Sequence, residues 1–160
     1  MALQSMTALA SITLQEASAS VSFSGIPQNY RDLVLVFNGT TAIADGVGSR
    51  FNGDSGANYS AVRMFGNASG ALSDSFSGFT RILQTGGDTN LPTIFVSQII
   101  DYSATNKHKT ALTRNSITNN NVNAIAARWA NTEAVTSVTV FSPGSTISAG
   151  SSISLYGRIG

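Results

Sequence analysis

Acidic side chains are the residues of this chain with the clearest potential for chemistry. Asp45, Asp54, Asp74 and Asp88 all fall in segments rich in Gly, Ser and Asn, which predict loops. Two loops at the same end of a β-sandwich could bring two carboxylates together around Ca²⁺, which takes about six to eight oxygen ligands. None of these loops has the alternating acidic spacing of a dedicated calcium loop. We therefore expect no metal site, and expect the aspartates to support turns through their own hydrogen bonds.

Catalytic constellations are hard to build from the remaining titratable residues. A glycosidase needs two carboxylates on either side of the scissile bond, and nothing ties Glu16 or Glu133, the two glutamates, to a cleft. His108, the sole histidine, stands between two lysines on an expected strand. No serine lies in a Gly-x-Ser-x-Gly elbow between a strand and a helix, which a hydrolase triad would require. The sequence predicts no enzyme, no catalytic residue and no cofactor.

Four aromatic residues provide a possible binding surface. Tyr30, Tyr59, Tyr102 and Trp129 could line a platform for a sugar, because an apolar ring face stacks on the apolar face of a sugar. Tyr59 and Tyr102 each stand beside a turn, where a phenol packs inward and still reaches a backbone partner. We expect all four to be core or turn-packing residues.

The composition excludes several classes of partner. Charged residues make up 11% of the 160 residues and the net charge is +1, whereas soluble proteins average about 25% charged residues. Lys107-His-Lys109 is the densest basic segment, too short for the basic stripe that nucleic-acid binding needs. Cysteine is absent, which removes disulfides and thiolate metal sites and fits folding in a reducing cytoplasm. Neither a signal peptide nor an apolar run of about 18 residues is expected.

Alternation of apolar and polar residues predicts the elements that position these side chains. Apolar residues recur with a period of two, which is typical of half-buried strands, and turn residues follow every 8–14 positions. Leu33–Phe37 is continuously apolar and is expected to lie centrally with both faces covered. We predict one domain over residues 1–160, an all-β antiparallel sandwich of nine to eleven strands that resembles a jelly roll and has no long helix. The expected strands are 8–14, 20–24, 33–37, one ending at 51, 59–65, 76–83, 93–101, 107–117, 122–130, 135–141 and 153–159.

The segment Arg50–Tyr59 is expected to organise the domain. It predicts a strand ending at Phe51, a turn, and a second strand that begins at Tyr59. Asn52-Gly53 and Ser55-Gly56 are turn dipeptides, because Gly and Asn tolerate positive φ angles. Such a loop presents backbone groups and short polar side chains on a stiff base.

Four segments in a fixed order resemble small jelly-roll virion proteins of tailed bacteriophages, especially those of aquatic hosts, over nearly the whole chain. They are Val21-Ser-Phe-Ser-Gly-Ile-Pro-Gln-Asn-Tyr30 leading into Asp32-Leu-Val-Leu35, then Arg50–Ser60, Ile100–Thr110 and Ser152-Ile-Ser-Leu-Tyr-Gly157. In that family such domains are head decoration (cement) proteins or modules of tail and fibre proteins, and no catalytic residue carries over.

The resemblance implies a virion structural protein, made in the bacterial host cytoplasm and seated on the outer surface of the head. Its implied partners are the major capsid protein and further copies of itself, with a trimer favoured, and no nucleic acid or membrane. Residues 1–7 are expected to form an extended arm that contacts a neighbour. The alternative is a carbohydrate-binding or receptor-binding module of the tail or a fibre, for which a host glycan would be the partner.

Overall fold

Twelve β-strands and no helix make up the part of the chain that the structure, a computed structural model, describes: residues 5–43, 46–67, 69–85, 90–118 and 121–160. The all-β prediction is confirmed. The strands are β1 (Met6–Thr13), β2 (Ser20–Ser24), β3 (Asp32–Gly39), β4 (Gly48–Phe51), β5 (Tyr59–Asn67), β6 (Gly70–Phe79), β7 (Ile82–Leu83), β8 (Thr93–Ile100), β9 (Lys109–Ile117), β10 (Asn121–Trp129), β11 (Ser137–Phe141) and β12 (Ser152–Arg158).

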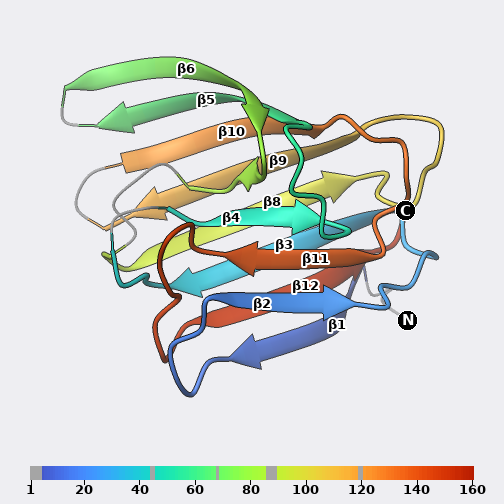
Figure 1. Cartoon of the computed structure of the whole chain (residues 1–160), viewed down its shortest axis with the longest axis horizontal. Coiled ribbons are helices and arrows are strands. Elements are labelled where there is room, and N and C mark those ends of the chain that lie inside the picture. The colour runs from blue at the N-terminus through green and yellow to red at the C-terminus, as the bar shows by residue number, and fades with distance from the viewer. Residues whose placement is uncertain (1–4, 44–45, 68, 86–89, 119–120) are drawn as a thin grey trace.

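Two antiparallel sheets form a sandwich. The large sheet has eight strands in the order β1-β12-β3-β8-β9-β10-β5-β6, and the small sheet has four in the order β2-β11-β4-β7. Figure 1 shows the small sheet in front of one side of the large sheet, with β5 and β6 reaching beyond it at the top of the view. The large sheet therefore extends past the small sheet at its β5–β6 end, whereas the inner side of β9 and β10 is buried, as at Thr113 and Ile125.

The connectivity is that of a jelly roll with two inserted hairpins. Without β5–β6 and β9–β10, the other eight strands form two four-stranded sheets, β1-β12-β3-β8 and β2-β11-β4-β7. With the hairpins left out, the chain crosses from one sheet to the other at every connection except the one from β4 to β7. This order of crossings is the pattern of two nested Greek keys. Both hairpins add to the large sheet on the same side, so they widen one layer from four strands to eight.

The strand count exceeds the predicted nine to eleven for one reason. The expected strand over residues 76–83 is two strands in different sheets, because the chain leaves β6 at Phe79 and enters β7 at Ile82. Arg81 lies in this crossing, where the alternation of apolar residues continues although the sheet changes. Period-two patterns describe each strand but carry no record of which sheet it joins.

The core lies between the sheets and is closed by aromatic contacts. On the large sheet Phe37 and Phe95 stack with ring centroids 5.2 Å apart, and both are buried. Val138 and Val140 of β11 supply buried aliphatic side chains from the small sheet. Gly157 of β12 is required by a close approach, because a Cβ there would lie 2.4 Å from the ring of Tyr30.

The expectation that Leu33–Phe37 is covered on both faces is wrong for one of the faces. Leu33, Leu35 and Phe37 are buried against the small sheet. Val34 and Val36 point the other way, where no second layer of the fold lies; Val34 is buried and Val36 is half-buried. The outer side of this continuous apolar run is therefore aliphatic, and neighbouring side chains of the same sheet cover it only in part.

Candidate functional site: the outer face of the large sheet

The loop between β4 and β5 is built for rigidity around Asp54. Oδ2 of Asp54 accepts hydrogen bonds from the indole Nε1 of Trp129 (2.6 Å) and from Nδ2 of Asn58 (2.9 Å). Oδ1 accepts the backbone N–H of Gly56 at 2.8 Å. Burial acts to raise the pKa of the Asp54 carboxyl, but these hydrogen bonds outweigh it and leave the pKa below its ordinary value. A carboxylate with its lone pairs so occupied is a structural group.

Asn52 ties the same loop to the segment before β11. Its φ of 51° is left-handed, and Gly53 follows with a φ of 69°, a pairing that Asn-Gly dipeptides favour. Oδ1 of Asn52 accepts the backbone N–H groups of Thr136 (2.8 Å) and Ser137 (3.2 Å), and Nδ2 donates to Ala134 O (2.8 Å). The expected organising segment is therefore a fixed turn that connects β4 of the small sheet to β5 of the large sheet and is held to the start of β11 by Asn52.

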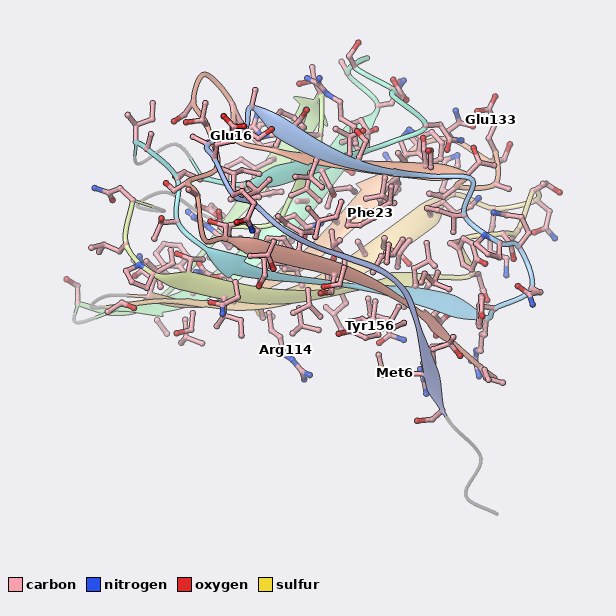
Figure 2. All side chains as sticks on the ribbon, turned by 90° about the horizontal axis from the view of Figure 1, so that it is seen from below. Met6, Glu16, Phe23, Arg114, Glu133 and Tyr156 are labelled. Carbon is pink, nitrogen blue, oxygen red and sulfur yellow. The ribbon has the colours of Figure 1, made fainter. Side chains whose placement is uncertain are left out.

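The other acidic candidates do not come together. Asp74 lies within β6, so its expected place in a loop is wrong, and it pairs with Arg63, whose Nε donates to Oδ1 at 3.0 Å. Asp45 and Asp88 lie outside the described residues. Glu16 and Glu133 are exposed and lie far apart in Figure 2. Among the residues with described positions, no three acidic or histidine side chains are grouped to hold a metal.

The basic and aromatic candidates are also accounted for. His108 is exposed and precedes β9 by one residue, so its expected place on a strand is wrong; β9 begins at Lys109. Tyr59, Tyr102 and Trp129 are buried, and Tyr30 packs against the core. The prediction that these aromatic residues belong to the core or to turns is confirmed, and they form no exposed platform.

A buried polar cluster between the sheets was missed by the sequence reasoning. The Thr113 hydroxyl lies 2.7 Å from Oε1 of Gln84 and 2.8 Å from the Ser97 hydroxyl, and Nε2 of Gln84 donates to Ser49 at 2.8 Å. All four residues are fully buried. None of them titrates near neutral pH, so the cluster fixes the fit between the sheets and has no acid or base to offer.

The surface with potential for binding is the outer face, defined as the side chains of the large sheet that point away from the small sheet. Seven of its apolar residues are 37–63% exposed: Met6, Val62, Met64, Ile94, Ile100, Leu112 and Val122. They alternate along their strands with buried core residues, such as Ala111 and Thr113 on either side of Leu112. Monomeric proteins rarely expose large apolar patches, so we take the outer face as the candidate interaction surface.

The charges of the outer face are predominantly positive. Arg114, Arg128 and Arg158 point outward from β9, β10 and β12, and Figure 2 shows Arg114 on the side of the large sheet opposite Phe23. Asp32 lies at the end of β3, but it is buried and holds Arg158 at 3.3 Å and Nε2 of Gln98 at 2.9 Å. In the described part of the chain, neither Arg114 nor Arg128 forms an ion pair.

The outer face is hollowed along β10. Ala124 and Ala126 of β10 lie directly between longer side chains of both neighbouring strands: Arg114 and Leu112 on β9, and Met64 and Val62 on β5. Two depressions follow, of about 610 Å³ around Ala124 and about 540 Å³ around Ala126. We call this feature the β10 groove; its floor is alanine and its walls are aliphatic side chains with one arginine.

Comparison with known proteins adds little about the role of this chain. No protein-family model matches the sequence, and no curated protein matches it. Among solved structures the chain is similar to alginate lyase Aly36B, with 13% identity, coverage of 92% of this chain and 77% of that chain, and a TM-score of 0.40. It is also similar to a protein of unknown function, SO2946 from Shewanella oneidensis MR-1, with 10% identity, 96% and 75% coverage, and a TM-score of 0.26. Similarities of this size carry no argument about function.

Proposed function

We propose that this protein is a structural protein of a bacteriophage virion, a head decoration protein that clamps the lattice of the major capsid protein. The observation that carries the proposal is the outer face, an eight-stranded surface with exposed aliphatic residues and no covering layer. A protein that works as a building block needs a rigid body and one broad contact surface. The jelly roll supplies the body, and the two inserted hairpins enlarge the surface.

The roles of the resembling motifs support the same proposal. The polar side-chain atoms of Asn52 and Asp54 in the second motif hold the loop to the segment before β11 and to Trp129. Gly157 of the last motif admits the ring of Tyr30, which ends the first motif. Residues that define a fold and leave no reactive group free suit a structural protein.

The area of the outer face is sufficient for a stable contact. The sheet has eight strands, and strands about 4.8 Å apart and about eight residues long outline roughly 900 Å². A standard protein interface buries about 800 Å² on each partner. Many copies on one shell act together, so contacts of modest individual affinity add up to a strong clamp.

The proposed homotrimer would use the two ends of the large sheet. β1 and β6 are its edge strands, and neither has a partner on its outer side in the described structure. β1 contains no charged residue or proline, and the one charged residue of β6, Asp74, is held by Arg63. Edges of this kind pair readily with other strands, and pairing β6 of one copy with β1 of the next closes a ring when the rotation allows it.

The arm proposed for residues 1–7 is reduced to its first residues. Met6 and Thr7 already belong to β1, where they pair with Arg158 and Gly157 of β12. Residues 1–4 lie outside the described part of the chain. Deleting residues 1–4 tests the arm without removing a strand pair. Unchanged occupancy on the capsid after that deletion would reject it.

Copy counting in purified particles tests the proposal. Quantitative mass spectrometry should find hundreds of copies per particle, because a decoration protein repeats with the capsid lattice. A few copies confined to the tail would instead support the alternative, a module that recognises a host glycan. The aromatic platform considered for that alternative is not available, since Tyr59, Tyr102 and Trp129 are buried.

A further inference from the structure

We propose that the β10 groove binds a segment of a different protein that carries aliphatic side chains and at least one carboxylate, and that it does not bind a second copy of this chain. The inference deepens the proposed function, on which it depends for the place of the partner within the particle. The chemistry of the partner is argued from the groove itself.

The shape of the groove selects an elongated occupant. Its floor follows the length of β10, from Val122 near one end to Arg128 near the other. Leu112 and Val62 form opposite walls on either side of Ala126, and Arg114 and Met64 do so on either side of Ala124. A strand or a helix lying along β10 would place aliphatic side chains over the alanines, where they lose the most contact with water.

The charges select carboxylates on the occupant. Arg114 stands on one wall and Arg128 at one end, and neither has an ion-pair partner in the described residues. A guanidinium that is covered without a partner pays a desolvation cost, whereas a carboxylate offers it two parallel hydrogen bonds. The partner segment should therefore carry Asp or Glu close to its apolar residues.

The same charges exclude a second copy. Asp32 is the one described carboxylate on the outer face, and it is buried and engaged by Arg158 and Gln98. Two outer faces brought together would therefore add the positive charges of both copies and offer their arginines no free carboxylate. Like charges that meet at an interface without a partner disfavour binding, so this surface suits a different protein.

Nucleic acid and lipid are weaker fits to the groove. Binding to a phosphate backbone depends on a row of basic residues, whereas Arg114 and Arg128 are separated by aliphatic walls at Leu112, Val62 and Met64. Two arginines without a basic cluster also offer little attraction to an anionic membrane. Both occupants remain outcomes that the experiment detects.

Photo-crosslinking in assembled particles tests the inference. The crosslinking amino acid p-benzoylphenylalanine replaces Leu112 on the groove wall in the full chain, and replaces Ser22 on the exposed side of the small sheet as a matched control. We expect the Leu112 position to crosslink to a peptide of another virion protein that contains Asp or Glu, and the Ser22 position to give at most weak products. A crosslink from position 112 to this same chain, to nucleic acid or to lipid would overturn the inference. So would the absence of any product at 112.

The outcomes separate this inference from the proposed function. Crosslinks from Ser22 alone, in particles that contain hundreds of copies, would keep the decoration role and reject the groove. Crosslinks from Leu112 to an acidic segment of a tail protein, or of a protein outside the virion, would keep the groove and reject the decoration role.

Charge reversal measures the part played by the arginine. Arg114→Glu should weaken rebinding of the purified protein to the crosslinked partner by about tenfold or more, whereas Arg114→Lys, which keeps the charge but loses the two parallel hydrogen bonds, should weaken it by less. Lys107→Glu makes the same change of charge at an exposed residue outside the groove and should have little effect. Equal losses for Arg114→Glu and Lys107→Glu would reject a specific carboxylate contact.

Discussion

The indole Nε1 of Trp129 donates a 2.6 Å hydrogen bond to Oδ2 of Asp54, and this bond joins the end of β10 to the loop between β4 and β5. Trp129 is fully buried between Phe51 and Tyr59, with ring centroids 5.7 and 6.4 Å away. The strand that floors the groove is therefore anchored at one end by a charged hydrogen bond. Substitutions at Asp54 should therefore weaken the packing of β10 and of the strands paired with it.

Asp54→Asn should lower the free energy of unfolding by about 2 kcal/mol, because hydrogen bonds to a charged group are worth about 1.5–3 kcal/mol each. The amide has one acceptor fewer for the donors of Trp129, Asn58 and Gly56. Urea unfolding followed by the fluorescence of the single tryptophan measures the change. Asp101→Asn is the matched control, since Asp101 forms an exposed ion pair with Lys107 and should cost under about 1 kcal/mol. Equal losses in the two variants would contradict the role of Asp54.

The stability from Asp54 should depend on pH in a defined direction. The pKa of Asp54 is lower in the folded protein than its ordinary value of 3.8. Its contribution is therefore fully present above that value and is lost as the pH falls through the folded pKa. The difference in unfolding free energy between the wild type and Asp54→Asn should be constant from pH 7 to about pH 5 and shrink below about pH 4. A difference that grows on acidification would reverse the sign and refute the assignment.

Asn52→Ala should cost about 2–3 kcal/mol, because it removes three hydrogen bonds to the backbone near β11 and leaves alanine at a φ of 51°. Asn52→Gly separates the two causes, since glycine accepts positive φ but restores no hydrogen bond. It should lie between the wild type and Asn52→Ala in thermal unfolding. A glycine variant as stable as the wild type would mean that the hydrogen bonds contribute nothing.

Gly157→Ala should destabilise the fold by about 2 kcal/mol or more, the scale of overpacking in a closed core. The added Cβ would lie 2.4 Å from the ring of Tyr30, within a strand that pairs on both sides. Gly66→Ala is the control, because a Cβ there meets its nearest neighbour at 3.8 Å. It should change stability by about 0.5 kcal/mol or less. The reverse order of the two variants in urea unfolding would contradict the packing described.

Alkaline titration should detect the buried Tyr59. Burial raises its pKa to about 12, and the nearby Asp54 charge adds to this, against the backbone hydrogen bond from Phe51. Tyrosinate absorbance should therefore include a phase near pH 12 that is missing in Tyr59→Phe. Stability from this group is present below the ordinary pKa near 10 and falls as the pH rises toward 12. Identical titration curves for the two proteins would rule out the burial.

Local pattern predicted a large part of this fold. Alternation found the strands that carry the core, and Asn52-Gly53 was correctly interpreted as a turn with positive φ angles. The pairing of the strands could not be predicted in the same way. β5 and β10 pair through residues about sixty positions apart, and the sequence has no local signal for such a pair. The two hairpins and their common side of the sheet therefore had to be seen in the structure.

The candidate site escaped the sequence for a related reason. An aliphatic run such as Leu33–Phe37 looks the same whether its second face is covered by the chain itself or by a partner. The signal that exists is the exposed alternate residues of β9 and β10, where Leu112, Ala124 and Ala126 stand in place of charged residues. These positions become informative once the small sheet is known to cover the opposite side.

The most direct measurement of the central claim is a cryo-electron microscopy reconstruction of the virion at a resolution that separates β-strands. We predict density for this sandwich on the outside of the head, repeated with the capsid lattice and turned so that the outer face of the large sheet meets the shell. A head without that density, or a sandwich seated through its small sheet, would contradict the account.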